Sequence, residues 1–292
     1  MQRIRDRGVD EPRGPTDDSP VVPAPVAPAA VVMPSAAGLP IAAALTIAAA
    51  VAFAVLATWI ARRGATLPVV DDRIHVWVIA HRSHGSITFA RVVTLGGATG
   101  VVLPALIVVG ALASRGGRDL LRRLLTGLLI AGVASVGVFM GLQINALVGR
   151  ARPSMADWAW PAGGASFPSG HTTTATLFAT GCAWVVAARV RPGWPRRTVW
   201  ATAVGWAAAV GWSRVWLGVH WPTDVLGGWL YGLAWFAGCA WVLLALRRRS
   251  ARRLASARPD QEKDEPGEDG DPQQATEGVD PTQRLVPRPQ GE

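Results

Sequence analysis

Two histidines of this chain stand where polar residues interrupt apolar sequence. His171 follows the turn formed by residues 168–170, and His220 lies four residues before Asp224. On a helix this spacing places the two side chains on one face, a turn apart, so Asp224 can hold one imidazole nitrogen and leave the other free as a base or nucleophile. The second histidine, His171, can then serve as a general acid toward a leaving oxygen.

Groups suited to bind an anion accompany both histidines. Ser169 and Gly170 open an apolar run, and the first N–H groups of a helix lack internal partners at the positive end of its dipole. Serine can cap such a helix, and glycine lets an anion approach the backbone closely. Arg152 and Arg214 are permanent charges with bidentate donors suited to phosphate, and Arg214 interrupts an otherwise apolar stretch.

Each of these features alone also fits a structural role. Ser169 can be a plain helix cap, Arg152 an ordinary loop charge, and His220 with Asp224 a structural pair. Together they supply an anion cradle, an oriented nucleophile and a proton donor, which is the set needed for phosphoryl transfer through a phosphohistidine. The chain offers no cluster of carboxylates for Mg²⁺, so we expect no metal and no other cofactor.

The elements that must position these residues are membrane helices. Half of the 292 residues are hydrophobic and only 17% are charged, against about a quarter in soluble domains. Most of the apolar blocks reach or approach the roughly 20 residues that cross about 30 Å of hydrocarbon as a helix. Uninterrupted runs also exclude the alternating pattern of a barrel. We therefore predict an all-α, integral membrane six-helix bundle, with its helices at Leu39–Ile60, Val92–Ala113, Leu124–Val148, His171–Ala188, Thr198–Ser213 and Val225–Leu246.

The net charge of +9 raises the possibility of nucleic-acid binding, but the arginines gather at the ends of the apolar blocks, as membrane orientation requires. Clusters at 115–123, 189–197 and 247–253 predict a cytoplasmic face that also holds both termini. The histidine motifs then lie on the extracytoplasmic face. Five arginines in the first outer loop oppose this orientation. We expect membrane lipids as partners and no nucleic acid.

The remaining segments divide the chain into three parts. Residues 1–38, rich in Pro and Ala, predict a disordered cytoplasmic arm. Residues 39–246 form the membrane domain, and residues 247–292 comprise a basic juxtamembrane segment followed by a disordered acidic tail. Apolar residues at 74–79 predict a short helix in the membrane interface.

The candidate catalytic and phosphate-binding residues resemble the motifs of the type-2 phosphatidic acid phosphatase superfamily, which also includes vanadium haloperoxidases and glucose-6-phosphatase. Its motifs are Lys-x6-Arg-Pro, Pro-Ser-Gly-His and Ser-Arg-x5-His-x3-Asp. The second stands complete at Pro168–His171, and the third runs complete from Ser213 to Asp224. The resemblance covers roughly residues 39–246 and implies a six-helix membrane phosphatase with an extracytoplasmic site.

The resemblance also implies a role for each matching residue. His220 is the expected nucleophile, Asp224 orients it, and His171 protonates the leaving group and later activates water. The expected phosphate-binding residues are Arg152, Ser169, Gly170 and Arg214. The lysine of the first motif is replaced by Asn145, so Asn145 and Arg150 are further candidates for phosphate contacts.

The expected activity is metal-independent hydrolysis of a lipid-linked phosphomonoester or diphosphate at the outer membrane face. Phosphatidic acid, phosphatidylglycerol phosphate and polyprenyl diphosphates such as undecaprenyl diphosphate are all candidate substrates. Two alternatives stay open. The same site could transfer phosphate to an alcohol as a lipid phosphotransferase, or Asn145 could mark a non-catalytic protein that binds lipid phosphates. The sequence does not distinguish among the substrates and gives no oligomeric state.

Overall fold

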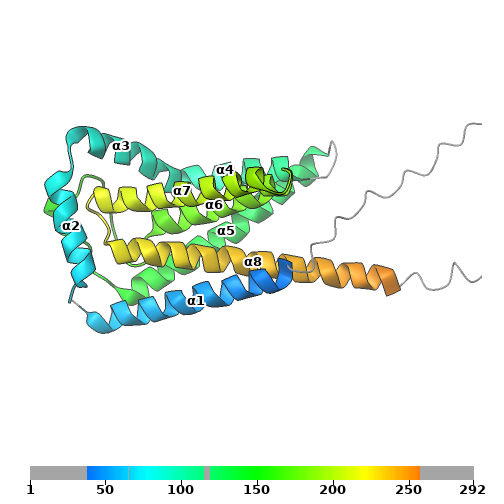
Figure 1. The fold of residues 1–292 in the computed structure, drawn as a ribbon, viewed down its shortest axis with the longest axis horizontal. Helices are drawn as coiled ribbons and strands as arrows, with labels where there is room; N and C mark the ends of the chain where they lie inside the picture. Colours follow the sequence, from blue (N-terminus) through cyan, green and yellow to red (C-terminus); the bar gives the residue numbers. More distant parts are fainter. Residues whose placement is uncertain (1–37, 65, 115–118, 257–292) are drawn as a thin grey trace, which may run out of the picture. The chain divides into compact units, whose positions relative to one another are not determined.

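The computed structural model describes residues 38–64, 66–114 and 119–256, which belong to one compact unit. The predicted disordered stretches at 1–37 and 257–292 lie outside these described residues. Within the described ranges all regular elements are helices and there are no strands, which confirms the all-α prediction (Figure 1). The elements are α1 (Gly38–Arg63), α2 (Val69–His81), α3 (His84–Thr94), η1 (Leu95–Gly97), α4 (Thr99–Ala113), α5 (Leu120–Val148), η2 (Met155–Asp157), α6 (Gly170–Ala187), α7 (Trp194–Trp216) and α8 (Pro222–Ser256).

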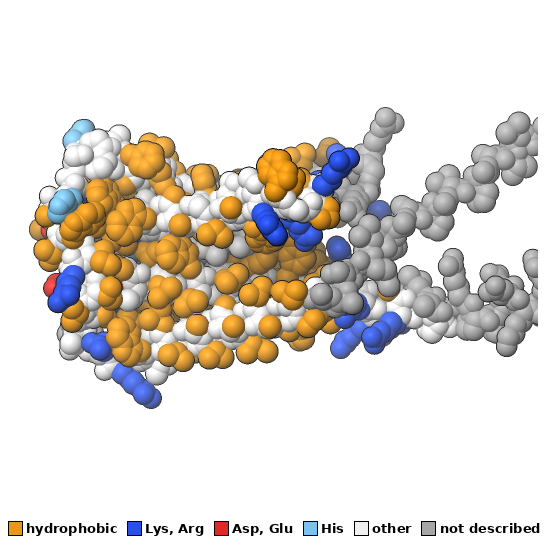
Figure 2. Space-filling model, in the orientation of Figure 1, with side chains coloured by type: hydrophobic (Ala, Val, Ile, Leu, Met, Phe, Trp, Pro, Cys, Tyr) orange, Lys and Arg blue, Asp and Glu red, His pale blue; other side chains and the backbone are white. Residues whose placement is uncertain are grey.

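Three of the described helices, α1, α5 and α8, are long and apolar enough to cross a membrane. α3 and α4, bent by 49° at the break between them, form a possible fourth span. Hydrophobic side chains cover the long sides of these helices, and arginines gather toward the ends (Figure 2). The chain is therefore an integral membrane protein by the length and composition of its helices.

α6 lies inside the bundle, among α4, α5, α7 and α8. It packs against α7 and α8 on one side and against α4 and α5 on the other, and nine of its eighteen residues are buried. Its threonines bond inside the helix: Thr174 Oγ1 donates to the Gly170 carbonyl at 2.7 Å, and Thr176 Oγ1 to the Thr172 carbonyl at 2.8 Å. Because α6 faces protein more than lipid, satisfied hydroxyl groups are tolerated there.

The second predicted block, Val92–Ala113, is not one straight helix. The chain leaves α3 through the 3-10 turn η1 and re-enters a helix at Thr99. The reason is a close approach: a Cβ on Gly97 would lie 2.5 Å from the His171 carbonyl oxygen and 2.7 Å from Val210 Cγ1. The break thus lets the backbone of η1 pack directly on the start of α6.

Local sequence also fixes where α5 ends. Gly149 follows α5 in a left-handed conformation with φ 62°, and its N–H donates to the Asn145 carbonyl at 3.1 Å. This is the usual way in which glycine ends a helix. The chain then enters the long loop 149–169, which lies beside α2 and the turn between α7 and α8.

The contact of Gly97 generates a stability prediction. Gly97→Ala should lower the free energy of unfolding by about 1–3 kcal/mol, because the new methyl group meets backbone that cannot yield easily. Gly100→Ala is the matched control, since Gly100 is helical with open space around it and alanine there should be neutral or stabilising by about 0.5–1 kcal/mol. Thermal unfolding in detergent measures both. Equal stability of the two variants would contradict the packing argument.

Candidate active site

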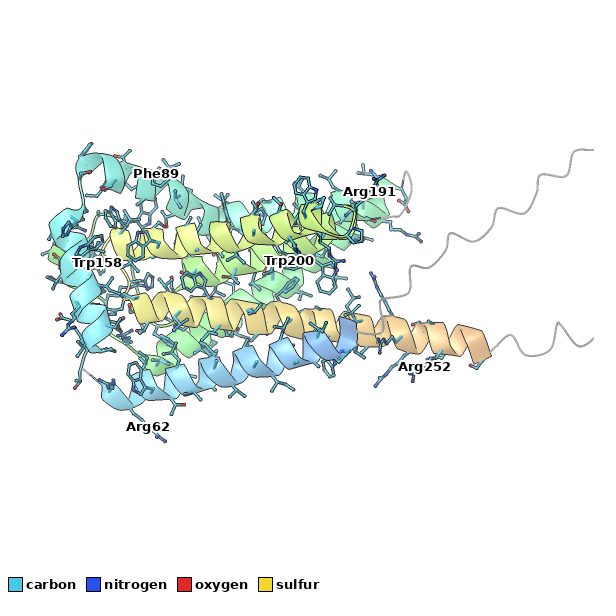
Figure 3. The ribbon with its side chains drawn as sticks, viewed as in Figure 1. Arg62, Phe89, Trp158, Arg191, Trp200 and Arg252 are labelled. Atoms are coloured by element: carbon cyan, nitrogen blue, oxygen red, sulfur yellow. The ribbon has the colours of Figure 1, made fainter. Side chains whose placement is uncertain are left out.

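Segments far apart in the sequence meet at one end of the bundle. They are α2, the loop 149–169, the first turn of α6, the last turn of α7 and the first turn of α8. Figure 3 shows Trp158 of this end beside α2, whereas Arg191 and Arg252 lie toward the opposite end. All three predicted motifs contribute side chains to this one region.

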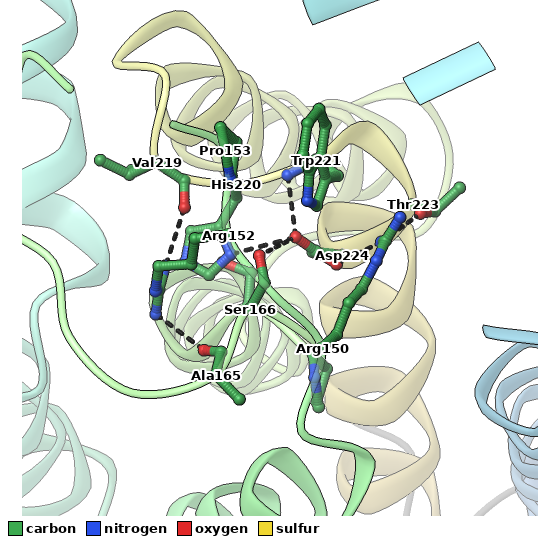
Figure 4. A network of polar contacts seen from close by, with 12 residues as sticks. Arg150, Arg152, Pro153, Ala165, Ser166, Val219, His220, Trp221, Thr223 and Asp224 are labelled. Carbon is green, nitrogen blue, oxygen red and sulfur yellow. Dashed lines mark hydrogen bonds and ion pairs between the residues drawn. The ribbon is translucent and has the colours of Figure 1, made fainter. Parts of the chain in front are cut away.

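His220 lies in the turn between α7 and α8, and only 2% of its surface is exposed. Its Nδ1 is 3.5 Å from Asp224 Oδ2, and its Nε2 is 2.9 Å from Arg152 Nη1 (Figure 4). A guanidinium can only donate hydrogen bonds, so Nε2 is the acceptor and Nδ1 carries the proton. The lone pair of a neutral imidazole therefore points toward the arginine side of the site.

Asp224 is fully buried in the first turn of α8. Its Oδ1 accepts from Arg150 Nη1 at 2.6 Å, and its Oδ2 accepts from Ser166 Oγ and from the Trp221 backbone N–H at 2.8 Å. Pro222 precedes it at the helix start, where the missing N–H has no cost. These donors fix the carboxylate rigidly against the His220 imidazole.

Arg150 lies between two carboxylates. Its Nη1 donates to Asp224 Oδ1 at 2.6 Å and to Thr223 Oγ1 at 2.7 Å, and its Nη2 donates to Asp71 Oδ2 at 2.6 Å. Asp71 comes from α2 and is fully buried. Our sequence reasoning missed Asp71, because no spacing ties one of two adjacent aspartates in an outer loop to a motif 79 residues later.

Arg152 is held by the loop that follows it. Its Nε and Nη2 donate to backbone carbonyls of residues 163–165 at 2.8–3.1 Å. Its Nη1 donates to the Val219 carbonyl at 2.8 Å as well as contacting His220. The guanidinium is thereby fixed with one donor group directly beside His220 Nε2.

Arg214 is the most deeply buried cation of the site, with 2% of its surface exposed. Its Nη1 donates to Thr94 Oγ1 at 2.8 Å, and its Nε has no hydrogen-bond partner among the residues that the structure describes. An unmatched buried donor is costly, and it marks a place where an anion would be bound favourably. Arg214 and Arg152 both lie within electrostatic range of His171 and His220.

The start of α6 carries the second motif as predicted. The buried Ser169 caps the helix, since its Oγ accepts from the Thr172 backbone N–H at 3.5 Å and from Thr172 Oγ1 at 2.9 Å. Its own N–H donates to the Asp224 carbonyl at 3.0 Å. Gly170 is exposed, with open space where a side chain would stand. His171 is partly exposed beside it.

Asn145 occupies the position of the first-motif lysine near the end of α5. Its Nδ2 donates to the carbonyls of Ala165 and Pro168 at 2.9 and 3.3 Å. It therefore ties α5 to the loop that carries the second motif.

Comparison with known proteins matches the PAP2 superfamily over residues 120–248. The chain belongs to the PAP2 superfamily. It is 32% identical to phosphatidylglycerophosphatase B of Bacillus subtilis over 141 residues, which cover 48% of this chain and 66% of that protein. It is 40% identical to an undecaprenyl-diphosphatase of Sulfolobus acidocaldarius over 67 residues, 23% of this chain and 28% of that protein. The matched segments thus span two thirds or less of these relatives.

A solved structure supports the same assignment. The crystal structure of the first transmembrane PAP2 type phosphatidylglycerolphosphate phosphatase from Bacillus subtilis is 26% identical, with a TM-score of 0.58, and the alignment covers 72% of this chain and 98% of that one. These findings confirm the family that the motifs indicated, and they place the chain among membrane PAP2 phosphatases.

The electrostatics of the PAP2 site keep His220 neutral. Burial lowers the pKa of His220 to about 4; Asp224 opposes this shift, and the charges of Arg214 and Arg152 reinforce it. Burial also lowers the pKa of Arg152 from its ordinary value, against the influence of Asp224. At neutral pH the His220 imidazole is therefore uncharged, with its Nε2 lone pair facing Arg152.

The pKa of His220 predicts acid sensitivity of the fold. The unfolded chain, with a histidine pKa near 6.5, binds a proton that the folded chain does not bind until about pH 4, so stability is complete above about pH 6.5 and falls as pH decreases toward 4. Between pH 7 and pH 4, the free energy of unfolding of His220→Gln should fall by about 3 kcal/mol less than that of the parent. His84→Gln, at an exposed position, is the control. Unfolding in detergent across this range measures the slopes, and identical slopes for the parent and His220→Gln would contradict a neutral buried imidazole.

Proposed function

We propose that this chain is a membrane phosphatase that hydrolyses a lipid-linked phosphomonoester or diphosphate through a phosphohistidine on His220, without a metal ion. The observation that carries the proposal is a buried, neutral imidazole whose Nδ1 lies 3.5 Å from Asp224 and whose Nε2 lone pair faces Arg152 Nη1 at 2.9 Å. The two arginines of the site, Arg152 and Arg214, supply the positive charge that a metal ion would otherwise bring to a phosphate. The phosphatase names of the PAP2 relatives support the same activity.

Substrate binding begins with an exchange of hydrogen-bond partners. A phosphate oxygen replaces His220 Nε2 as the acceptor of Arg152 Nη1, which frees the lone pair to face phosphorus. The Nε of Arg214 and the first amides of α6, where Gly170 leaves open space, receive the other oxygens. Ser169 holds this helix start in place.

The first chemical step forms a bond between His220 Nε2 and phosphorus while the bond from phosphorus to the leaving oxygen breaks. His171 takes up a proton when the bound phosphate anion offsets the charges of Arg152 and Arg214, and it gives that proton to the leaving oxygen. The positive charge that develops on the imidazole is balanced by Asp224, whose Oδ2 lies 3.5 Å from Nδ1. In the second step His171 takes a proton from water, the water oxygen attacks phosphorus, and the P–N bond breaks to release phosphate and neutral His220.

The geometry of Arg150 and Asn145 favours roles other than the phosphate contacts that we expected. Arg150 donates its hydrogen bonds to two carboxylates and Thr223, and Asn145 donates those of its amide to two loop carbonyls. We propose that Arg150 supports Asp224 and that Asn145 supports the loop.

The site lies at the end of the bundle opposite the basic clusters, so the tendency of arginines to face the cytoplasm supports an extracytoplasmic site with cytoplasmic termini. We propose six crossings: α1, the bent α3–α4 pair, α5, α6, α7 and α8. α6 is the most enclosed of these, whereas α7 also exposes large apolar side chains such as Val204 and Trp206.

An apolar groove of about 220 Å³ between α3 and α7 adjoins the site and supports a lipid substrate. It is lined by Phe89, Trp212 and Trp216 and reaches Ser213, the neighbour of Arg214. A phosphate with a hydrocarbon tail could place its head at the arginines and its tail along this groove. Phosphatidylglycerol phosphate, phosphatidic acid and undecaprenyl diphosphate are the substrates to compare.

The proposal predicts phosphate release by detergent-solubilised protein in EDTA. His220→Ala should lower the rate about a thousandfold or more, because it removes the nucleophile. His84→Ala, at an exposed histidine, should match the parent. A radiolabelled substrate should leave an acid-labile, alkali-stable label on the parent and none on His220→Ala. Release that survives in His220→Ala would contradict the mechanism, and no release from any lipid phosphate by the parent would favour a non-catalytic binding protein.

The same phosphoenzyme predicts the outcome of competition between acceptors. We expect inorganic phosphate as the main product when glycerol is added in excess, because the second step uses His171 to activate a water. Separation of labelled products by chromatography measures the ratio. Glycerol phosphate as the main product would instead identify a phosphotransferase.

A further inference from the structure

Asp71 is the one fully buried acidic side chain, within the described residues, that lies outside the three motifs. It comes from α2, which the sequence placed at the membrane interface. Its Oδ2 accepts from Arg150 Nη2 and from Thr223 Oγ1, both at 2.6 Å, and its Oδ1 accepts from the Thr223 backbone N–H at 2.9 Å. Asp71 thus contacts Arg150, which is the ion-pair partner of Asp224, and Thr223, which precedes Asp224 in the chain.

These contacts form a row of alternating charge that ends at the nucleophile. Asp71 pairs with Arg150, Arg150 with Asp224, and Asp224 with His220. If Asp71 were absent, the charge of Arg150 would fall on Asp224 alone, and the pair would be neutral. With Asp71 present, the row retains one negative charge. In a buried setting such a charge acts strongly on its neighbours, because water does not screen it.

The retained charge matters when His220 becomes cationic. A phosphorylated or otherwise covalently bound His220 carries positive charge and sits close to Arg152 and Arg214, which oppose it. His171, the other titratable group near His220, contributes no negative charge. Asp224 is then the only anion in contact with His220 among the described residues, and its influence depends on how far Arg150 neutralises it.

We propose that Asp71 is a positioning residue, which acts through Arg150 to leave Asp224 charged and aligned against His220. The inference rests on the proposed function of His220 as the nucleophile. It makes α2 part of the catalytic unit. A second contact holds α2 there, since His75 lies 3.1 Å from Asp157 and packs on the Trp221 ring.

A simpler alternative is that Asp71 only pins α2 to the start of α8 through Thr223. The two ideas differ when Arg150 also loses its charge. If Asp71 offsets Arg150, then Arg150→Gln should rescue Asp71→Asn, because Asp224 regains its full charge. If Asp71 only holds α2 against α8, the second substitution should weaken vanadate binding further.

Orthovanadate and inorganic phosphate are suitable probes, measured by calorimetry on the full-length protein in detergent. Vanadate can accept a bond from His220 Nε2 and so reports on the charged, attacked state, whereas phosphate binds the same cradle without that bond. We expect Asp71→Asn to weaken vanadate binding about tenfold or more, as for other groups that orient a reactive side chain from behind. Phosphate binding should be unchanged. Asp72→Asn, at the exposed adjacent position, should match the parent for both probes.

The double variant Asp71→Asn with Arg150→Gln decides between the two ideas. We expect its vanadate affinity to return to within about threefold of the parent. The double variant removes two opposite buried charges together, so it leaves no unpaired buried charge. It therefore still tests the proposal if Asp71→Asn alone does not fold. Vanadate binding by the double variant as weak as in Asp71→Asn, or more than about tenfold weaker than in the parent, would overturn the proposal. An equal loss of phosphate and vanadate affinity in Asp71→Asn would overturn it too.

Turnover is measured separately, so the two proposals fail separately. A parent that binds vanadate in the expected pattern but hydrolyses no lipid phosphate would disprove the phosphatase activity and leave the role of Asp71 intact. A parent that hydrolyses lipid phosphates through His220, with vanadate binding unaffected by Asp71→Asn, would do the reverse.

Discussion

A buried carboxylate must be matched by donors, and the match at Asp224 organises this site. Its two oxygens receive Arg150, the Ser166 hydroxyl and the Trp221 backbone N–H, and His220 lies against one of them. These partners come from the loop after α5 and from the turn before α8. An aspartate left unmatched at this depth would cost several kcal/mol, so satisfying it draws the segments of the site together.

The helices set the distances within which this match can form. Gly228 of α8 approaches the start of α6 so closely that a Cβ there would lie 2.8 Å from the Ser169 carbonyl oxygen. On the opposite side of α6, Gly97 meets the His171 carbonyl in the same way. The second motif is therefore held between two glycine contacts. The position of His171 relative to His220 follows from backbone packing and does not depend on flexible side chains.

The sequence predicted the parts of the fold that a local pattern encodes. Apolar runs located the helices, and the spacing of His220 and Asp224 predicted their proximity, although His220 lies in the turn before α8 and not on the helix. The break at Gly97 was missed, since hydrophobicity shows a run of apolar residues and not the backbone contact that divides it. Asp71 and the position of Arg150 were missed for a related reason. A charge pair between residues 79 apart in sequence is created by tertiary packing, and it cannot be predicted from residue type or spacing.

The unequal distribution of charge across the site suggests why it suits a lipid phosphate. On one side of His220, Asp71, Arg150 and Asp224 form a paired row that carries one net negative charge. On the other side, the hydrogen bonds of Arg214 and Arg152 within the described part of the chain go to uncharged groups. Arg214 donates to a threonine hydroxyl, and Arg152 to backbone carbonyls and the neutral imidazole. The excess positive charge thus faces the open side of His220, where a phosphate dianion would be its natural counter-ion. Apolar side chains of α3 and α7 border this side, so an anion with a hydrocarbon tail satisfies both surfaces at once, whereas a small soluble phosphate satisfies one of them.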